Sequence, residues 1–136
     1  MKYLLDTDIC AYIISGRRED TAAHFARVRP GDIAVSTISL AELAFGAFKS
    51  GSARNLERLQ VFISPLTIVD FDSDAAMVYG DLRNKLQRAG TPIGPMDMLI
   101  AAQALMLDLT LVTNNVREFK RVAALRIENW AAASPK

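Results

Sequence analysis

Acidic side chains stand at three distant places in the chain where the surrounding residues are apolar. Asp6 follows the apolar run Tyr3–Leu5, Glu42 lies within ISLAELAFGAF, and Asp97 lies within GPMDMLIAAQAL. Acids are rarely buried without a partner, and no basic residue lies within four positions of Glu42. If the three carboxylates converge in the fold, their repulsion keeps some of them protonated unless a cation balances the charge.

The residue types favour a hard divalent cation. Oxygen ligands without a histidine or cysteine cluster select Mg²⁺ or Mn²⁺ over Zn²⁺. The sequence contains one histidine, His24, which we expect at the surface, and one cysteine, Cys10, which we expect in the core. Because Mg²⁺ keeps bound water and binds phosphate oxygens, the expected chemistry is phosphodiester hydrolysis. A histidine pair, which would allow a metal-free nuclease, is not present in the sequence.

Two further oxygen-bearing side chains lie near predicted strand ends. Asp8 is expected at or near the start of the helix that follows Asp6, where capping of that helix explains an acid. Asn115 follows the predicted strand Thr110–Thr113, and its type suits a turn. Its amide oxygen could also bind a cation or one of the cation's water molecules.

Short apolar runs alternate with longer helical patterns along the chain. The predicted strands are Tyr3–Leu5, Ile33–Val35, Thr67–Val69, Thr110–Thr113 and Arg126–Glu128. The predicted helices are Ile9–Ser15, Thr21–Val28, Ser39–Lys49, Ala53–Phe62, Ser73–Arg88 and Asp97–Leu107. This alternation predicts one α/β domain, with a mainly parallel sheet flanked by helices on both faces. Ligands of such sheets bind at the carboxyl ends of the strands, where Asp6 and Asn115 are expected.

The composition fits a small intracellular domain. The chain has 136 residues, of which 51% are hydrophobic, so an intrinsically disordered protein is excluded. A net charge of +1 neither requires nor forbids a nucleic-acid partner. A lone cysteine allows no internal disulfide, and no apolar stretch is long enough to cross a bilayer. We therefore expect a cytoplasmic protein with no membrane partner.

Four segments together resemble the PIN-domain ribonucleases, and more narrowly the VapC toxins of bacterial toxin–antitoxin pairs. They are LLDTDI, ISLAELAFGA, IGPMDMLIAAQAL and LVTNNVREFKRVAALRIENW, which occur in register between Tyr3 and Trp130. The resemblance implies a PIN domain over residues 1–136 and a metal-dependent endoribonuclease. Its catalytic and metal-binding acids fall on Asp6, Glu42 and Asp97.

The resemblance departs from the family pattern at two positions. The family's fourth acidic position falls on Asn115, which puts a tightly held second metal ion in doubt. Asp8 matches a position that more often holds Asn or Ser, so it is expected at most to touch the water shell of the ion.

The resemblance also implies partners. It indicates a homodimer that is held inactive by a VapB-type antitoxin, whose tail reaches the acidic pocket. It implies an RNA substrate: closely similar toxins cut the anticodon region of initiator tRNA, and others cut different tRNAs or rRNA. Arg117 and Lys120 follow Asn115 and are candidates for phosphate contacts, although a solvated helix face explains them equally well. We expect Phe45, Phe48 and Phe119 in the core rather than as platforms for bases.

Two other functions remain open at this point. A strand that ends in Asp-x-Asp also suits a haloacid-dehalogenase-like phosphohydrolase, in which Asp6 would be the nucleophile. That family usually continues with Gly-Thr, whereas Ile9 and Cys10 follow here, and no clear late lysine motif is present. The second alternative is a non-catalytic module with the PIN fold, which measured binding of Mg²⁺ or Mn²⁺ would argue against.

Overall fold

A single parallel sheet forms the centre of the molecule. The computed structural model describes residues 1–131 of the chain. The described residues form a five-stranded sheet with the order β3-β2-β1-β4-β5, in which every neighbouring pair is parallel. The strands are β1 (Tyr3–Leu5), β2 (Ile33–Ser36), β3 (Thr67–Val69), β4 (Thr110–Val112) and β5 (Ile127–Glu128). Each strand agrees with its predicted range to within one residue at either end.

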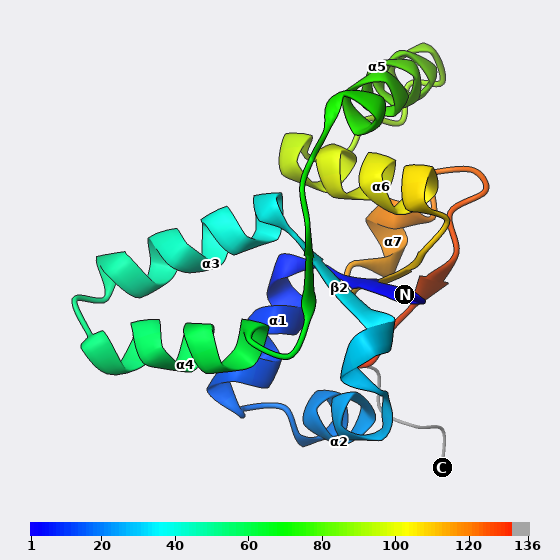
Figure 1. Ribbon diagram of the computed structural model, residues 1–136. Coiled ribbons are helices and arrows are strands. Elements are labelled where there is room, and N and C mark those ends of the chain that lie inside the picture. Colours follow the sequence, from blue (N-terminus) through cyan, green and yellow to red (C-terminus); the bar gives the residue numbers. More distant parts are fainter. Residues whose placement is uncertain (132–136) are drawn as a thin grey trace.

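Helices connect the strands and cover both faces of the sheet, as the sequence predicts (Figure 1). They are α1 (Thr7–Ser15), α2 (Glu19–Arg27), α3 (Thr37–Lys49), α4 (Ala53–Ile63), α5 (Ser73–Arg88), α6 (Pro95–Leu107) and α7 (Val116–Phe119). A short 3-10 helix, Pro30–Asp32, precedes β2. The 3-10 helix and α7 were not expected from the sequence, because three or four residues are too few to show a helical period.

The strands divide the hydrophobic core into two clusters, one on each face. Residue Leu4 of β1 pairs with Ala34 and Leu111, and all three pack in the cluster beneath α5, α6 and α7. The next register row, formed by Leu5, Val35 and Val112, belongs to the opposite cluster with residues of α1 and α4. This alternation follows from the two-residue period of a strand and leaves both faces of the sheet apolar.

Capping residues explain why several helices begin earlier than predicted. The side chain of Asp6 accepts a hydrogen bond from the backbone N–H of Ile9, so α1 begins at Thr7. Ser36 caps α3 in the same way, through the N–H of Ile38. Asp8 lies in the first turn of α1, where the helix dipole favours an acid as expected, but the residue that caps the helix is Asp6.

Three expectations about individual aromatic or imidazole rings need correction. Phe45 and Phe48 are exposed, whereas Phe119 is buried as expected. His24 is partly buried, because its ring stacks on Trp130 with a centroid distance of 4.5 Å. Cys10 is fully buried, as predicted.

Within residues 1–131, no helix is both long and apolar enough to cross a membrane.

Candidate active site

The candidate site lies where the strand order changes direction. From β1 the chain moves to β2 and β3 on one side, and then to β4 and β5 on the other side. The carboxyl ends of β1 and β4 therefore meet at a topological switch point, the usual ligand position in open parallel sheets. The backbone N–H of Asp6 donates to the carbonyl of Val112 at 3.0 Å, which joins the two strand ends.

Asp6 is the most buried acid of the site, at 5% exposure. Its carboxylate accepts a hydrogen bond from the N–H of Ile9 at 2.9 Å, and an interaction with the side chain of Thr113 lowers its pKa. Burial raises its pKa to about 6, against the lowering effect of these hydrogen bonds, and the nearby charges of Asp8 and Glu42 raise it further. The side chain is thus fixed in place, and it has no oppositely charged partner within residues 1–131.

Glu42 reaches the site from α3 and is half-buried. The hydroxyl of Thr7 donates to its Oε1 at 2.7 Å and lies 3.1 Å from the hydroxyl of Ser39. Because Thr7 is the first residue of α1, this contact ties Glu42 to the residue next to Asp6. The sequence argument placed Glu42 among core neighbours, but one of those neighbours, Phe45, is exposed, and the partner of Glu42 is this hydroxyl.

Asp97 lies in the first turn of α6, two residues after Pro95 begins the helix. Partial burial raises its pKa to about 6, and the next largest causes are the charges of Glu118 and then Asp6, with smaller effects from the other acids of the site. The negative side chains of separate segments therefore act on one another. Asp6, Glu42 and Asp97 therefore lie in one region of the fold, although within residues 1–131 they are not grouped closely enough to hold a metal ion as they stand.

Glu118, in α7, is an acid of this site that the sequence argument missed. Its carboxylate accepts hydrogen bonds from the backbone N–H of Gly94 and from the amide of Asn115, the latter at 2.6 Å. A Cβ atom at Gly94 would lie 3.5 Å from Asp97 Oδ2 and 3.6 Å from Glu118 Oε1, so both carboxylates flank that glycine. The one signal for Glu118 in the sequence is its position in VREF, three residues after Asn115.

The remaining predicted residues lie around these acids. Asn115 is exposed; its backbone N–H donates to Thr113 Oγ1 at 2.9 Å, and its side chain is held by Glu118. Asp8 is exposed and contributes negative charge to both Asp6 and Asp97. Arg117 and Lys120 are exposed beside Glu118, and neither forms an ion pair within the described chain.

The chemistry of these side chains fits a hard cation, although the side chains are not preassembled around one. All of the donors are oxygens, and in residues 1–131 no lysine, arginine or histidine forms a salt bridge with Asp6, Glu42 or Asp97. No three acids, histidines or cysteines of that part of the chain are already grouped closely enough to hold a metal ion. A divalent ion would therefore have to draw the side chains together or bind some of them through water.

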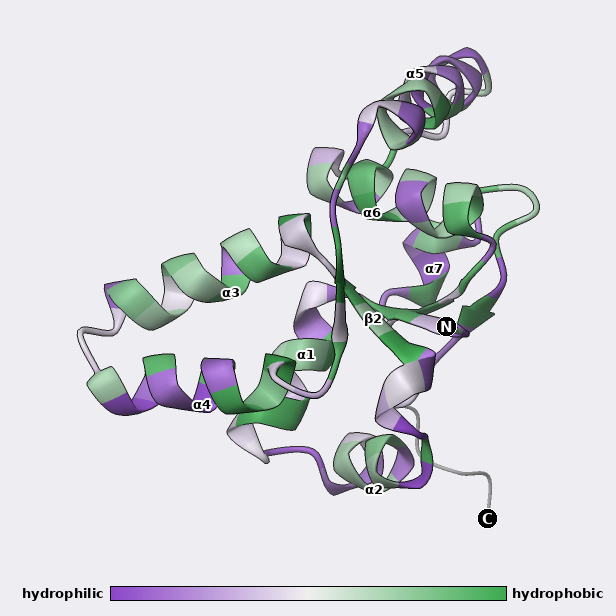
Figure 2. Cartoon of the chain, in the orientation of Figure 1, coloured by the Kyte–Doolittle hydropathy of each residue, from purple (hydrophilic) through white to green (hydrophobic). Residues whose placement is uncertain are grey.

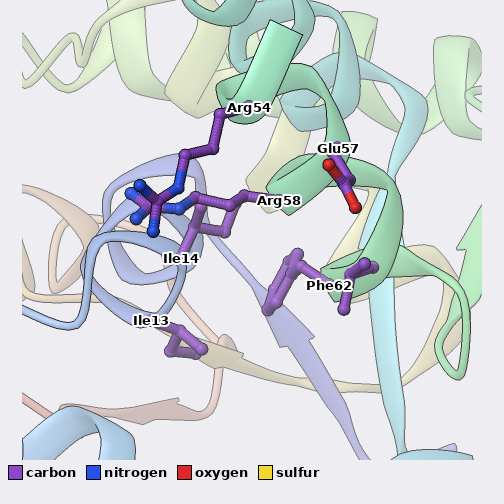
Figure 3. Close-up of a pocket in the computed structure, with 7 residues that line it drawn as sticks. Ile13, Ile14, Arg54, Glu57, Arg58 and Phe62 are labelled. Atoms are coloured by element: carbon purple, nitrogen blue, oxygen red, sulfur yellow. The ribbon is translucent and has the colours of Figure 1, made fainter.

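A separate surface cavity of about 470 Å³ lies between α1 and α4 (Figure 3). Its lining combines apolar side chains with two arginines and one glutamate: Ile13, Ile14, Arg54, Glu57, Arg58, Val61 and Phe62. Figure 3 shows Arg54, Arg58 and Ile14 among the side chains that line it. None of the clustered acids lines this cavity, so the carboxylate chemistry belongs to the switch point.

Comparison with known proteins identifies the family of the chain. The sequence matches the PIN domain family over residues 3–125. It is 41% identical over 131 residues to the tRNA(fMet)-specific endonuclease VapC of Salmonella typhimurium, covering 96% of this chain and 98% of the relative. It is 42% identical over 132 residues to ribonuclease VapC2 of Rickettsia felis, covering 96% and 98%.

Solved structures of VapBC complexes contain chains that resemble this one in fold and sequence. The crystal structure of VapBC2 from Rickettsia felis bound to a promoter DNA fragment contains a chain that matches with a TM-score of 0.88 at 40% identity, covering 96% of this chain and 99% of that one. DNA-bound VapBC from Salmonella typhimurium matches with a TM-score of 0.87 at 41% identity, covering 96% and 98%. These findings leave the haloacid-dehalogenase alternative without support. The chain belongs to the PIN-domain family and, within it, to the VapC ribonucleases.

Proposed function

We propose that this protein is a divalent-metal-dependent endoribonuclease toxin that hydrolyses phosphodiester bonds of a tRNA at the switch-point site. One structural observation carries the proposal: acids from separate segments converge without a basic partner in residues 1–131. Membership of the VapC ribonucleases supports the reaction class. The name of the Salmonella relative supports initiator tRNA as the first substrate to test.

In this proposal Asp6, Glu42 and Asp97 are the candidate catalytic acids and hold Mg²⁺ or Mn²⁺, with Asn115 and Asp8 in supporting positions. A bound ion supplies positive charge for the scissile phosphate and a water molecule activated for attack. The protein's own contribution is to position these acids. Thr113 orients Asp6 and Thr7 orients Glu42, while Glu118 orients Asn115.

The proposal extends to partners. The matched structures from Rickettsia felis and Salmonella typhimurium are VapBC assemblies, which supports a VapB-type antitoxin as the inhibitory partner. We propose a homodimer, which sedimentation velocity would detect, and phosphate contacts from Arg117 and Lys120. We expect the protein to act in the cytoplasm, where its RNA substrate is found and where Cys10 stays reduced.

The test uses purified toxin freed of any antitoxin and stripped of metal. We expect cleavage of initiator tRNA when Mg²⁺ or Mn²⁺ is added, none in excess chelator, and discrete ends when the products are mapped on total RNA. Cleavage that persists in chelator would contradict the metal-dependent mechanism. Tight binding of RNA without cleavage under every metal condition would favour the non-catalytic module.

A further inference from the structure

Helix α3 presents two exposed aromatic rings to solvent. Phe45 is 67% exposed and Phe48 is 69% exposed, whereas the other four phenylalanines are buried or half-buried. The opposite side of α3 is packed: Ala47 is buried, and Leu43 packs against the core cluster that includes residues of α4. The rings are therefore left outside because the other side of the helix is already occupied.

The exposed rings continue along the helix from the candidate catalytic acid. Phe45 lies one turn after Glu42, and Phe48 lies a further turn along, so the three residues span about 9 Å of helix axis. Their exposed neighbours are small. Ala41 is exposed, and a Cβ atom added at Gly46 would meet nothing within 4 Å. Both side chains are therefore accessible from solvent on the stretch of α3 that continues from Glu42.

The exposed side of α3 carries one cation next to an aromatic ring. Glu42 and Lys49 are the only charged residues in α3. The Lys49 ammonium lies 5.9 Å from the centroid of the Phe45 ring. Figure 2 shows α3 mainly in white and green, whereas α4 beside it carries more hydrophilic bands. Open aromatic rings next to a cation are the elements with which proteins hold unpaired nucleotides, through base stacking and phosphate contact.

We propose that Phe45, Phe48 and Lys49, here called the α3 platform, bind unpaired nucleotides of the RNA next to the scissile bond. Bases stack on the two rings, and the ammonium group of Lys49 contacts a phosphate. This inference rests on the proposed ribonuclease function and adds to it a preference for unpaired RNA. An exposed apolar stripe also suits a protein partner, but continuity with Glu42 on one helix and the neighbouring cation favour RNA.

The test measures RNA affinity in an Asp6→Asn background, in which cleavage is blocked. The probes are a labelled single-stranded RNA of about 12 nucleotides and the same sequence as a duplex. The double variant Phe45→Leu/Phe48→Leu keeps apolar volume but removes both rings, so we expect its single-strand affinity to fall about tenfold or more. The double variant Phe45→Trp/Phe48→Trp keeps an aromatic ring at both positions and should bind the single strand as tightly as the parent. Met77→Leu, an exposed position on α5, is the matched control and should leave affinity unchanged.

The cleavage-competent variants add a second readout. We expect KM for a hairpin RNA with a cleavable loop to rise in the double leucine variant, with kcat nearly unchanged and the same melting temperature. Leucine variants that bind single strands as tightly as the parent would overturn the proposal. So would a parent that fails to bind single-stranded RNA, or leucine variants whose only defect is conversion of a dimer to a monomer in sedimentation. RNA binding without metal-dependent cleavage would overturn the proposed function and not the platform.

Discussion

Acidic side chains in two regions of the molecule have opposite surroundings. Away from the switch point, four aspartates form ion pairs at 2.8–3.2 Å: Asp20 with Arg18, Asp32 with Arg29, Asp81 with Lys85, and Asp108 with Arg126. At the switch point, Asp6, Glu42 and Asp97 form no such pair within residues 1–131. Four aspartates outside the switch point thus have a basic partner, whereas the three acids of the switch point have none within the described residues.

The pKa values express this difference. A hydrogen bond from Arg18 is the main cause that lowers the pKa of Asp20, whereas burial is the main cause that raises the pKa of Asp6. Desolvation without a compensating charge costs folding free energy, so a fold keeps such a cluster where the missing charge arrives from outside. This difference supports the proposal that the switch point receives a positive charge from a bound ion.

The largest expected effect comes from neutralising one acid in each region. Asp6→Asn should lower RNA cleavage about 10³-fold, the scale of losing a preorganised electrostatic group. Asparagine keeps the volume and still caps α1, so the fold should persist. Asp20→Asn is the matched control, because it removes the same charge from a paired site and should cleave RNA at the wild-type rate. Initial cleavage rates with saturating metal measure both variants. Equal losses of cleavage rate in the two variants would show that the acids of the switch point have no special role.

The second prediction concerns stability against pH without metal. The pKa of Asp6 is about 6 in the fold and 3.8 as its ordinary value, so the native state holds a proton that the unfolded state has lost. The stabilisation from this carboxyl is present below about pH 4 and is lost as pH rises to about 6, by up to about 3 kcal/mol. Asp97 acts in the same direction.

Urea unfolding of wild type and Asp6→Asn from pH 4 to pH 7 isolates this contribution. The difference in unfolding free energy should grow in favour of Asp6→Asn as pH rises, because asparagine carries no charge to desolvate. Saturating Mg²⁺ should stabilise the wild type and reduce the difference, since the ion binds only the folded carboxylates. If the unfolding free energies of the two proteins change with pH in parallel, burial does not destabilise the charged form of Asp6.

The sequence allowed the frame of the site to be predicted but not its inner contacts. Short apolar runs show where the strands end, and the carboxyl ends of parallel strands lie at the same edge of a sheet. Asp6 after β1 and Asn115 after β4 could therefore be placed on one edge. Asp97 was also placed correctly, because Pro95 marks the start of a helix. The role of Glu118 depends on a hydrogen bond from Gly94, which is 24 residues away in the sequence. The spacing of apolar residues within one helix or strand gives no information about such a contact.

The α3 helix shows a different limit. Its sequence is apolar on nearly every side, so the pattern predicted burial for Phe45 and Phe48 without showing which side would face a neighbour. The side occupied by α4 and the core was decided by tertiary packing. His24 was misjudged for the same reason, since its stacking partner Trp130 comes from the last part of the described chain. Long-range pairings are what the sequence left undetermined.

The third prediction tests how the unbalanced acids are held. Glu118→Ala removes both hydrogen-bond acceptors, for the N–H of Gly94 and the amide of Asn115, and should lower kcat about 10–100-fold, as for outer-shell groups of metal sites. Glu118→Gln retains an oxygen for Gly94 but cannot serve both donors, so it should lie between wild type and alanine. Glu57→Ala, on α4, is the control. A Glu118→Ala enzyme with unchanged kcat and metal affinity would remove Glu118 from the site.

The smallest expected effect concerns Glu42, whose partner within the described chain is a neutral hydroxyl. Thr7→Val keeps the shape of Thr7 but removes the 2.7 Å hydrogen bond to Glu42, at a cost of about 1 kcal/mol in stability and a severalfold fall in cleavage rate. Thr7→Ser keeps the hydroxyl and should stay near wild type. The Thr7→Val defect should shrink at high Mg²⁺ concentration, because bound metal can orient the carboxylate that the hydroxyl no longer holds. A defect independent of metal concentration would mean that Thr7 acts by packing alone.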